Sequence, residues 1–413
     1  MKFLSPLLLL LATSLHAATL PGFRVETIAG VPGFVSSVVA DSKGTIYCTT
    51  TDGWIFRIEE GTAVPVASLP THAGGNAGLL GMALLDDDTA AVHYTAWFGE
   101  RVLDDVISRV DLASGAETVL RSFACDIEVR ERGASDEHHG GNPIVAPDGS
   151  IFVGIGEYND LFLAQEEAWN GGKIFRLYPS GYVEQYARGM RNPYDMAWDP
   201  DLGRLVVADN GPSGGDELHI IGAGSNCGWP RTVGNDPPLE GAVPPDYVFP
   251  NTVAPTGLHR LARDANGMLA RGYLLAAFVT SSIYYFPDLA AKPIADPVPV
   301  VADFEQFVID VTQTPDGTIY FASATFAGTS RIHRLHVPPR GDCNGDGLTN
   351  GSDILSLMHE LDDGNPHAAL QAQDGSHAGS WGCDVNADGM IDSADLQTLT
   401  RQLSRKRRAV RVR

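Results

Sequence analysis

The stretch APDGSIFVGIG (146–156), followed after a loop by GGKIFRLYPSG (171–181), carries the pattern that decides the fold. An Asp-Gly turn precedes an apolar strand, and a second strand after the loop ends in Arg-Leu. Short strands between such turns, repeating every ~40–60 residues, are typical of the four-stranded blades of a β-propeller. We therefore predict an all-β, six-bladed propeller over residues 18–336, with a β-sandwich pair as the alternative. Similar phrases recur at 41–58, 199–210 and 314–335.

The N-terminal stretch MKFLSPLLLLLATSLHA (1–17) predicts a secretory signal peptide that is cut after Ala17. A single Lys2 precedes an apolar run, and small residues stand at the cleavage position. The run is shorter than the ~20 apolar residues that a membrane-spanning helix needs, and no later segment qualifies. We expect a soluble, exported protein without a membrane span, located in the periplasm, outside the cell or at the cell surface.

The overall charge is strongly acidic. The chain has 29 Lys and Arg against 51 Asp and Glu, a formal net charge of −22. This balance argues against nucleic acid and anionic membranes as partners. The last residues, RKRRAVRVR (405–413), reverse the sign, and we expect them to form a disordered, solvated basic tail.

Two twelve-residue stretches near the C-terminus, DCNGDGLTNGSD (342–353) and DVNADGMIDSAD (384–395), predict calcium loops. Each has oxygen-bearing side chains at positions 1, 3, 5, 9 and 12 and glycine at position 6, which is the spacing that wraps a chain around Ca²⁺. Amphipathic helices are expected after the loops, at 353–361 and 395–403, because apolar residues recur there at helical spacing.

The two loop–helix units resemble the type I dockerin repeat. Position 12 is Asp in both loops, and the first loop follows Pro-Pro-Arg-Gly (338–341) with no helix before it. We place a linker at 337–341 and the dockerin-like module at 342–404. The resemblance implies a cohesin on a cell-surface scaffold as partner; a calcium-rigidified tail with another exported role is the alternative. It implies as calcium ligands Asp342, Asn344, Asp346, Leu348 (carbonyl), Asn350 and Asp353 in one loop, and Asp384, Asn386, Asp388, Met390 (carbonyl), Asp392 and Asp395 in the other.

The five cysteines divide into two groups. Cys343 and Cys383 flank the calcium loops at nearly equivalent places, and we predict a disulfide between them. At least one of the other three, Cys48, Cys125 and Cys227, stays unpaired or pairs outside the chain. No zinc site is expected, since no CxxC or HxxxH spacing occurs.

Several segments of the propeller region resemble the soluble pyrroloquinoline quinone (PQQ) sugar dehydrogenases, the glucose/sorbosone or aldose sugar dehydrogenase family. The segments are GLLGMAL (78–84), EHHGGNPIVAPDGSIFVGIGE (137–157), GKIFRLYPSG (172–181), YARGMRNPYDMAWDP (186–200), VVADNGPSGGDELHIIGAGSNCGWP (206–230) and APTGL (254–258). The resemblance implies a six-bladed propeller with cofactor and sugar at its mouth.

The same resemblance implies site residues at the mouth. His138 is the general base that takes the proton of the sugar C1 hydroxyl, and Asn76, Arg191 and Asn192 bind the cofactor. Two calcium sites are also implied: an active-site ion held by the carbonyls of Gly211 and Pro212, and a structural ion held by Glu217 and the carbonyl of Cys227.

The chain departs from the family at the cations that hold the three PQQ carboxylates. Phe307 and Ile309 stand where the family has arginines, and no lysine occurs near 274–286. Arg271 and Arg331 are the candidates to replace them. Each charge-assisted contact contributes roughly 1.5–3 kcal/mol, so PQQ binding in the family's manner is in question.

These observations favour an exported sugar dehydrogenase-like protein that oxidises an aldose or a sugar end at C1 with PQQ and Ca²⁺. The dockerin-like module would attach it to a polysaccharide-degrading or cell-surface assembly. Two alternatives stay open: a catalytically degenerate propeller that binds carbohydrate or protein, and a hydrolase or lactonase that uses mouth-bound Ca²⁺ and His138.

Overall fold

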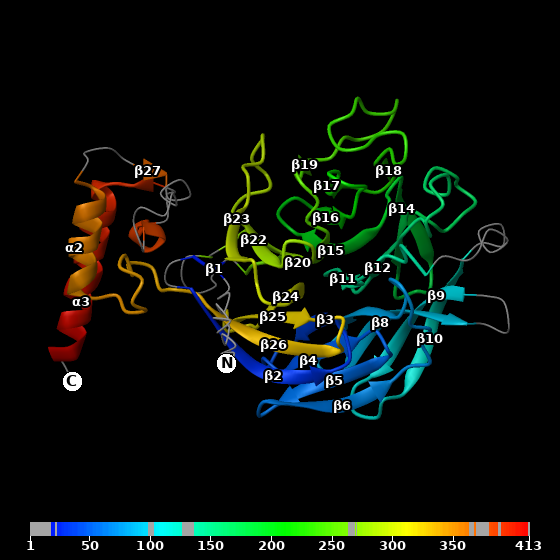
Figure 1. Ribbon diagram of the computed structural model, residues 1–413, viewed down its shortest axis with the longest axis horizontal. Coiled ribbons are helices and arrows are strands. Elements are labelled where there is room, and N and C mark those ends of the chain that lie inside the picture. The colour runs from blue at the N-terminus through cyan, green and yellow to red at the C-terminus, as the bar shows by residue number, and fades with distance from the viewer. Residues whose placement is uncertain are drawn as a thin grey trace, which may run out of the picture.

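The computed structural model describes residues 18–20, 23–97, 103–125, 136–262, 269, 271–362, 367–368, 380–386 and 390–411. The predicted signal peptide and Asp388 lie outside these residues. The described chain is mostly β-structure, followed by two α-helices near the C-terminus (Figure 1). The prediction of an all-β domain with a small helical module behind it is therefore confirmed.

The strands form five large, mostly antiparallel sheets arranged around the molecule (Figure 1). One four-stranded sheet contains β7 (Leu79–Leu84), β8 (Thr89–Trp97), β9 (Leu103–Asp111) and β10 (Glu117–Ala124); the other contains β15 (Pro193–Asp199), β16 (Arg204–Asp209), β17 (Glu217–Ile221) and β19 (Tyr247–Val248). One five-stranded sheet contains β11 (Ile144–Val145), β12 (Ile151–Ile155), β13 (Lys173–Leu177), β14 (Val183–Arg188) and β18 (Ser225–Asn226); the other contains β1 (Ala18–Thr19), β20 (Pro255–Arg260), β21 (Tyr273–Ala277), β22 (Ser282–Phe286) and β23 (Val298–Ala302).

The fifth sheet joins the two ends of the β domain. Its order is β24-β25-β26-β2-β6-β5-β4-β3, and β2 pairs antiparallel with β26 from Arg24↔His336 to Pro32↔Thr329. A single parallel contact, Gly30↔Thr62, links β2 to β6. The strands are β2 (Arg24–Pro32), β3 (Val35–Ala40), β4 (Ile46–Thr50), β5 (Trp54–Glu59), β6 (Thr62–Ser68), β24 (Phe307–Gln313), β25 (Ile319–Ala324) and β26 (Thr329–His336).

The core lies between neighbouring sheets. Strands β4, β12 and β21 are buried along their whole length, as continuous apolar runs predict. In one cluster Phe152 of β12 and Ile174 of β13 pack with Met196 and Leu205 of the next sheet. These inner strands therefore bury both faces, whereas outer strands such as β6 and β10 are largely exposed.

Two buried carboxylates connect inner strands: Asp195 joins two different sheets, and Asp310 joins the two end strands of the eight-stranded sheet. Asp195 Oδ2 in β15 accepts hydrogen bonds from the backbone N of Leu258 in β20 at 2.6 Å and from Asn142 Nδ2 at 3.0 Å. Asp310 Oδ2 in β24 accepts from the backbone N of Val38 in β3 at 2.8 Å. Three sheets and the loop before β11 are tied together at these two side chains.

The C-terminal module is built on α2 (Gly351–Glu360) and α3 (Ser393–Arg411), with the short elements η1 (Ser380–Cys383), β27 (His367–Ala368) and β28 (Met390–Ile391). Both predicted helices are present. The predicted disulfide between Cys343 and Cys383 is confirmed, and it lies in a buried cluster with Leu357 and Leu399 of the two helices. Cys48, Cys125 and Cys227 form no disulfide within the described residues.

The predicted disordered tail is wrong for the part that the structure describes. Helix α3 continues through the basic run to Arg411. Arg, Lys and Ala are strong helix formers, and cations near a helix C-terminus interact favourably with its dipole, so the run extends a helix whose apolar face is already anchored. Neither this helix nor any other in the described residues has the length and apolarity to cross a membrane.

Candidate functional site

A cavity of about 580 Å³ brings together most of the residues predicted for the mouth. Its volume is within the range of small-molecule sites. Pro212, the other predicted carbonyl ligand, directly follows the lining residue Gly211, and its carbonyl accepts a hydrogen bond from Gly215 N at 2.8 Å. The predicted residues that line the cavity are Asn76, His138, Arg191, Asn192 and Gly211.

His138 is oriented by a carboxylate that the sequence analysis did not identify. Its Nδ1 lies 2.9 Å from Glu157 Oε1, and Glu157 is buried. Because a carboxylate only accepts, Nδ1 carries the proton and Nε2 keeps the lone pair in the neutral ring. His138 also has a left-handed φ of 58°. A histidine in this state can accept a proton from a bound hydroxyl group.

Asn192 and Arg191 are held by Asp209, a second residue that sequence reasoning missed. The carboxylate of Asp209 accepts from the backbone N of Asn192 at 2.7 Å and of Arg191 at 3.0 Å. Burial, followed by the charge of Glu217, raises the pKa of Asp209 to about 7. Asn192 Oδ1 in turn accepts from Gly140 N at 2.9 Å, so it fixes the backbone two residues after His138.

Arg191 braces the backbone at the predicted active-site calcium ligands. Its Nη1 donates to the carbonyl oxygens of Asn210 at 2.9 Å and of Gly211 at 3.0 Å. Its guanidinium carbon also lies 5.8 Å from the centre of the Trp229 ring. The guanidinium therefore already hydrogen-bonds to the carbonyl of Gly211, which the family resemblance assigns to the calcium ion.

An aromatic wall, formed by Phe34, Phe278 and Phe326 with Phe307 packed against it, lines the cavity in place of the cations that the family resemblance implies. Phe278 stacks on Phe307 with ring centres 4.3 Å apart, and Phe307 lies 5.1 Å from Phe326. Phe326 is 78% exposed. Arg191 is the only arginine or lysine among the lining residues that the structure describes. Neither proposed replacement lines the cavity: Arg331 pairs with Glu305 at 2.7 Å, and Arg271 is absent from the wall.

Glu217, the predicted structural calcium ligand, lies beside Asp209 and His219 rather than in the cavity. Its Oε2 is 2.9 Å from His219 Nε2. Burial lowers the pKa of His219, but the contacts with Cys227 and Glu217 outweigh burial and raise that pKa well above its ordinary value. Glu217 and Cys227, the two residues assigned to the structural calcium site, therefore both contact His219.

The first calcium loop is wrapped around its carboxylates. Asp342 Oδ2 accepts from Gly347 N at 2.8 Å, and Asp353 Oδ1 accepts from Cys343 N at 2.9 Å. The carboxyl groups of Asp342 and Asp353 are buried. Burial, together with the charges of Asp353 and Asp346, raises the pKa of Asp342. A divalent cation would relieve this repulsion, so the oxygen donors fit Ca²⁺.

The second loop repeats the arrangement where it is described. Asp395 is buried, and its two oxygens accept from Asn386 N at 3.0 Å and from Asp392 N at 2.9 Å. Asp384 and Met390 lie in the same described stretches. In the first loop Asn344 Oδ1 accepts from Asp346 N at 3.0 Å, and the Leu348 side chain is exposed.

Comparison with known proteins gives a family match for each of the two parts of the chain. Residues 35–332 match the Glucose / Sorbosone dehydrogenase family, and residues 340–404 match the Dockerin type I domain. The chain is 24% identical over 312 residues to the aldose sugar dehydrogenase YliI of Escherichia coli strain K12, covering 68% of this chain and 82% of that protein.

Solved structures of this family share the fold. A glucose dehydrogenase-type oxidoreductase from Thermus thermophilus superposes with a TM-score of 0.64 and 26% identity, over 76% of this chain and 100% of that one. The PQQ-bound aldose sugar dehydrogenase of Streptomyces coelicolor gives a TM-score of 0.63 at 22% identity, over 77% and 99% of the two chains. The chain therefore belongs to the glucose/sorbosone dehydrogenase family, and a type I dockerin domain follows its dehydrogenase-like domain.

Proposed function

We propose that the β domain oxidises the C1 hydroxyl group of an aldose, or of a sugar end, in the mouth cavity. The observation that carries this proposal is the buried His138–Glu157 pair at a cavity that also gathers Asn76, Arg191 and Asn192. Family membership supports sugar oxidation as the reaction class.

The residues present supply the proton transfer and the orientation. His138 Nε2 accepts the C1 hydroxyl proton, while Glu157 holds the tautomer and stabilises the imidazolium that forms. Phe278 and Phe326 offer apolar faces to the C–H side of a sugar ring. The C1 hydrogen leaves as hydride to an acceptor of the quinone class, which balances the two-electron oxidation.

PQQ is the acceptor that the family implies, but the described cavity does not fit it in the family's manner. Three carboxylates face one guanidinium, Arg191, which is already bonded to two backbone carbonyls. The phenylalanine side chains of the opposite wall cannot pair with carboxylates.

The described strands support six blades. Dividing the eight-stranded sheet at its single parallel contact leaves β3–β6 as one antiparallel unit and β2 with β24–β26 as another. Together with the four other sheets this gives six units. We assign residues 18–336 to this propeller and 342–404 to the dockerin domain, behind a signal peptide that directs export.

The dockerin domain attaches the enzyme to a cohesin. Calcium at the two loops fixes α2 and α3, which present the binding surface. Sugar oxidation would then take place beside other carbohydrate-active partners on an extracellular scaffold.

Carbohydrate binding without redox chemistry is the second candidate function. The aromatic wall favours it, because exposed aromatic faces suit sugar rings whether or not oxidation follows. In this second candidate function, the cavity binds a sugar but no electron acceptor.

The test is a calorimetric titration of the calcium-saturated full chain with PQQ, followed by dye reduction with a panel of aldoses. We expect sugar-dependent dye reduction that falls at least about 100-fold in His138→Gln. His336→Gln is the matched control, since that histidine contacts Glu26 on β2 outside the cavity. Saturable sugar binding without dye reduction would support the second candidate function. If the protein neither binds sugar nor reduces the dye, both candidate functions are wrong.

A further inference from the structure

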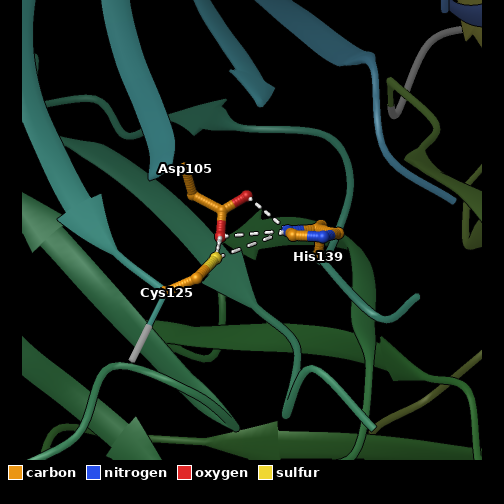
Figure 2. Close-up of side chains that lie close together, drawn as sticks. All are labelled: Asp105, Cys125 and His139. Atoms are coloured by element: carbon orange, nitrogen blue, oxygen red, sulfur yellow. Dashed lines mark hydrogen bonds and ion pairs between the residues drawn. The ribbon is translucent and has the colours of Figure 1, made fainter. Parts of the chain in front are cut away.

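A separate cluster of side chains lies between the β7–β10 sheet and the loop before β11 (Figure 2). Asp105 comes from β9, Cys125 directly follows β10, and His139 is the neighbour of His138. His139 Nδ1 is 3.1 Å from Asp105 Oδ1, and Cys125 Sγ is 3.8 Å from Asp105 Oδ2 and 4.0 Å from His139 Nδ1. The side chains of Asp105 and His139 are completely buried.

These separations match the edges of a tetrahedral metal site. Zinc bonds of ordinary length at tetrahedral angles place nitrogen and oxygen ligands roughly 3.4 Å apart, and sulfur roughly 3.6 Å from either. With Asp105 Oδ2 as the carboxylate donor, the observed distances are 3.3 Å to His139 Nδ1, 3.8 Å to Cys125 Sγ, and 4.0 Å between Nδ1 and Sγ, close to these values. Shifts of a few tenths of an ångström would bring the three donor atoms onto one ion.

His93 on β8 has the hydrogen-bonding pattern of a metal-binding histidine. Its Nδ1 lies 2.8 Å from the carbonyl oxygen of Gly141, which can only accept, so Nδ1 carries the proton. In the neutral ring Nε2 is then a bare lone pair, and it faces Asp105 Oδ1 at 3.2 Å. Two acceptors in contact require a cation or an additional proton between them. A histidine that donates to a backbone carbonyl and turns its other nitrogen to a metal is the usual arrangement.

The charges of the cluster balance around a divalent ion. One carboxylate and one thiolate carry two negative charges, and the two imidazoles are neutral as ligands. A divalent cation makes the set neutral, which matters because uncompensated charge is costly in a fully buried place. Tyr158 donates to Asp105 Oδ2 at 2.7 Å and would hold the carboxylate in position.

We propose that Asp105, Cys125 and His139 bind one divalent transition-metal ion of the zinc class. His93, whose Nε2 lies against Asp105 Oδ1 outside this group of three, moves toward the ion to become the fourth ligand. The ion ties β8, β9 and the end of β10 to the segment that carries His138. The site differs from the calcium loops in its chemistry, because thiolate and imidazole ligands suit zinc-class ions and loops of carboxylate and carbonyl oxygens suit calcium.

The test is a Co²⁺ titration of the full-length protein after chelation and re-saturation with Ca²⁺. We expect one equivalent of Co²⁺ to produce a thiolate-to-cobalt charge-transfer band, which one equivalent of Zn²⁺ abolishes. Cys125→Ser should remove the band, and His139→Gln should weaken Co²⁺ binding at least about tenfold. Cys48→Ser is the matched control, because Cys48 is an equally buried cysteine on β4 outside the cluster.

Two results would overturn the proposal: a wild-type protein without the band, or a band that persists in Cys125→Ser. If Cys125→Ser does not fold, His139→Gln and His93→Gln give the same decision from their Co²⁺ affinities. Unchanged affinities in both histidine variants would contradict the assigned ligands.

Discussion

In the proposed reaction, Glu157 orients the His138 ring so that His138 can act as the base. Its carboxylate fixes the proton on Nδ1 and leaves Nε2 to accept. Glu157 belongs to the stretch that also contains His138, yet the sequence alone does not reveal the pairing. The two residues are 19 positions apart, and only the folded sheet returns the chain to the same place.

Replacement of Glu157 by Gln should lower kcat for sugar oxidation by about 10–100-fold, with a smaller change in KM. A neutral amide neither holds the tautomer firmly nor stabilises the imidazolium. Dye reduction at saturating sugar measures the loss, and Glu184→Gln on β14, whose carboxylate contacts only Tyr178 among the described side-chain partners, is the control. An unchanged kcat in Glu157→Gln would show that the pair has no catalytic role.

At the scale of elements, loop spacing predicted the two helices of the dockerin domain, because metal-loop positions and apolar periodicity are local signals. The length of α3 was not predicted. The basic run was assigned to solvent by its charge, whereas helix propensity and the anchored first turns extend it to Arg411. Local charge does not decide helicity where a neighbouring helix is already nucleated.

Removal of calcium should unfold the dockerin domain and leave the β domain intact. Asp353 connects the start of α2 to the backbone of residues 343 and 344, so Asp353→Ala should weaken calcium binding in the first loop by more than about tenfold, or about 1.4 kcal/mol. Circular dichroism with a chelator and calcium titration by calorimetry measure both effects. Asp88→Ala, in a surface turn of the β domain, should bind calcium as the wild type does.

Cys343 and Cys383 close a loop with a sequence separation of 40 residues. Loop-closure entropy gives the bond a stabilising contribution of up to about 4 kcal/mol for a loop of this length. The double Cys→Ser variant should therefore lower the unfolding temperature of the dockerin domain and make it more dependent on calcium. A domain that unfolds at the same temperature with and without the bond would contradict this.

For the whole molecule, the recurring Asp-Gly-strand phrase predicted an all-β domain, and the structure is mostly β. The pairing of β2 with β26 was not predicted from that phrase, since it joins residues such as Thr27 and His333 that are 306 positions apart.

The cavity is likewise built from residues that lie far apart in the sequence. Sequence similarity located His138, Arg191 and Asn192, but the aromatic wall emerged only when Phe34, Phe278 and Phe326 came together.

The buried pair Asp195 and Asp310 should make the β domain less stable as the pH rises. Burial raises the pKa of Asp310 to about 7, and burial with the charge of Asp310 raises that of Asp195. An unfolded Asp has a pKa of about 3.9, so the folded state binds more protons between these values and stability falls through this window.

Urea unfolding from about pH 5 to about pH 8 at saturating calcium measures this slope. Asp310→Asn should reduce the loss of unfolding free energy over this pH range by roughly 1.4 kcal/mol for each unit by which folding raises the pKa of Asp310. This difference is independent of the variant's own stability. A variant with the wild-type slope would show that Asp310 does not titrate in this range.

In the proposed reaction the mouth cavity oxidises sugar at C1 with His138 as the base. The most direct measurement compares dye reduction with C1-protonated and C1-deuterated aldose in the wild type and in His138→Gln. We predict slower turnover of the deuterated sugar in the wild type, the corresponding lactone as product, and loss of that turnover in the variant. Sugar that binds in the cavity and is recovered unchanged under every quinone and dye tested would contradict the claim.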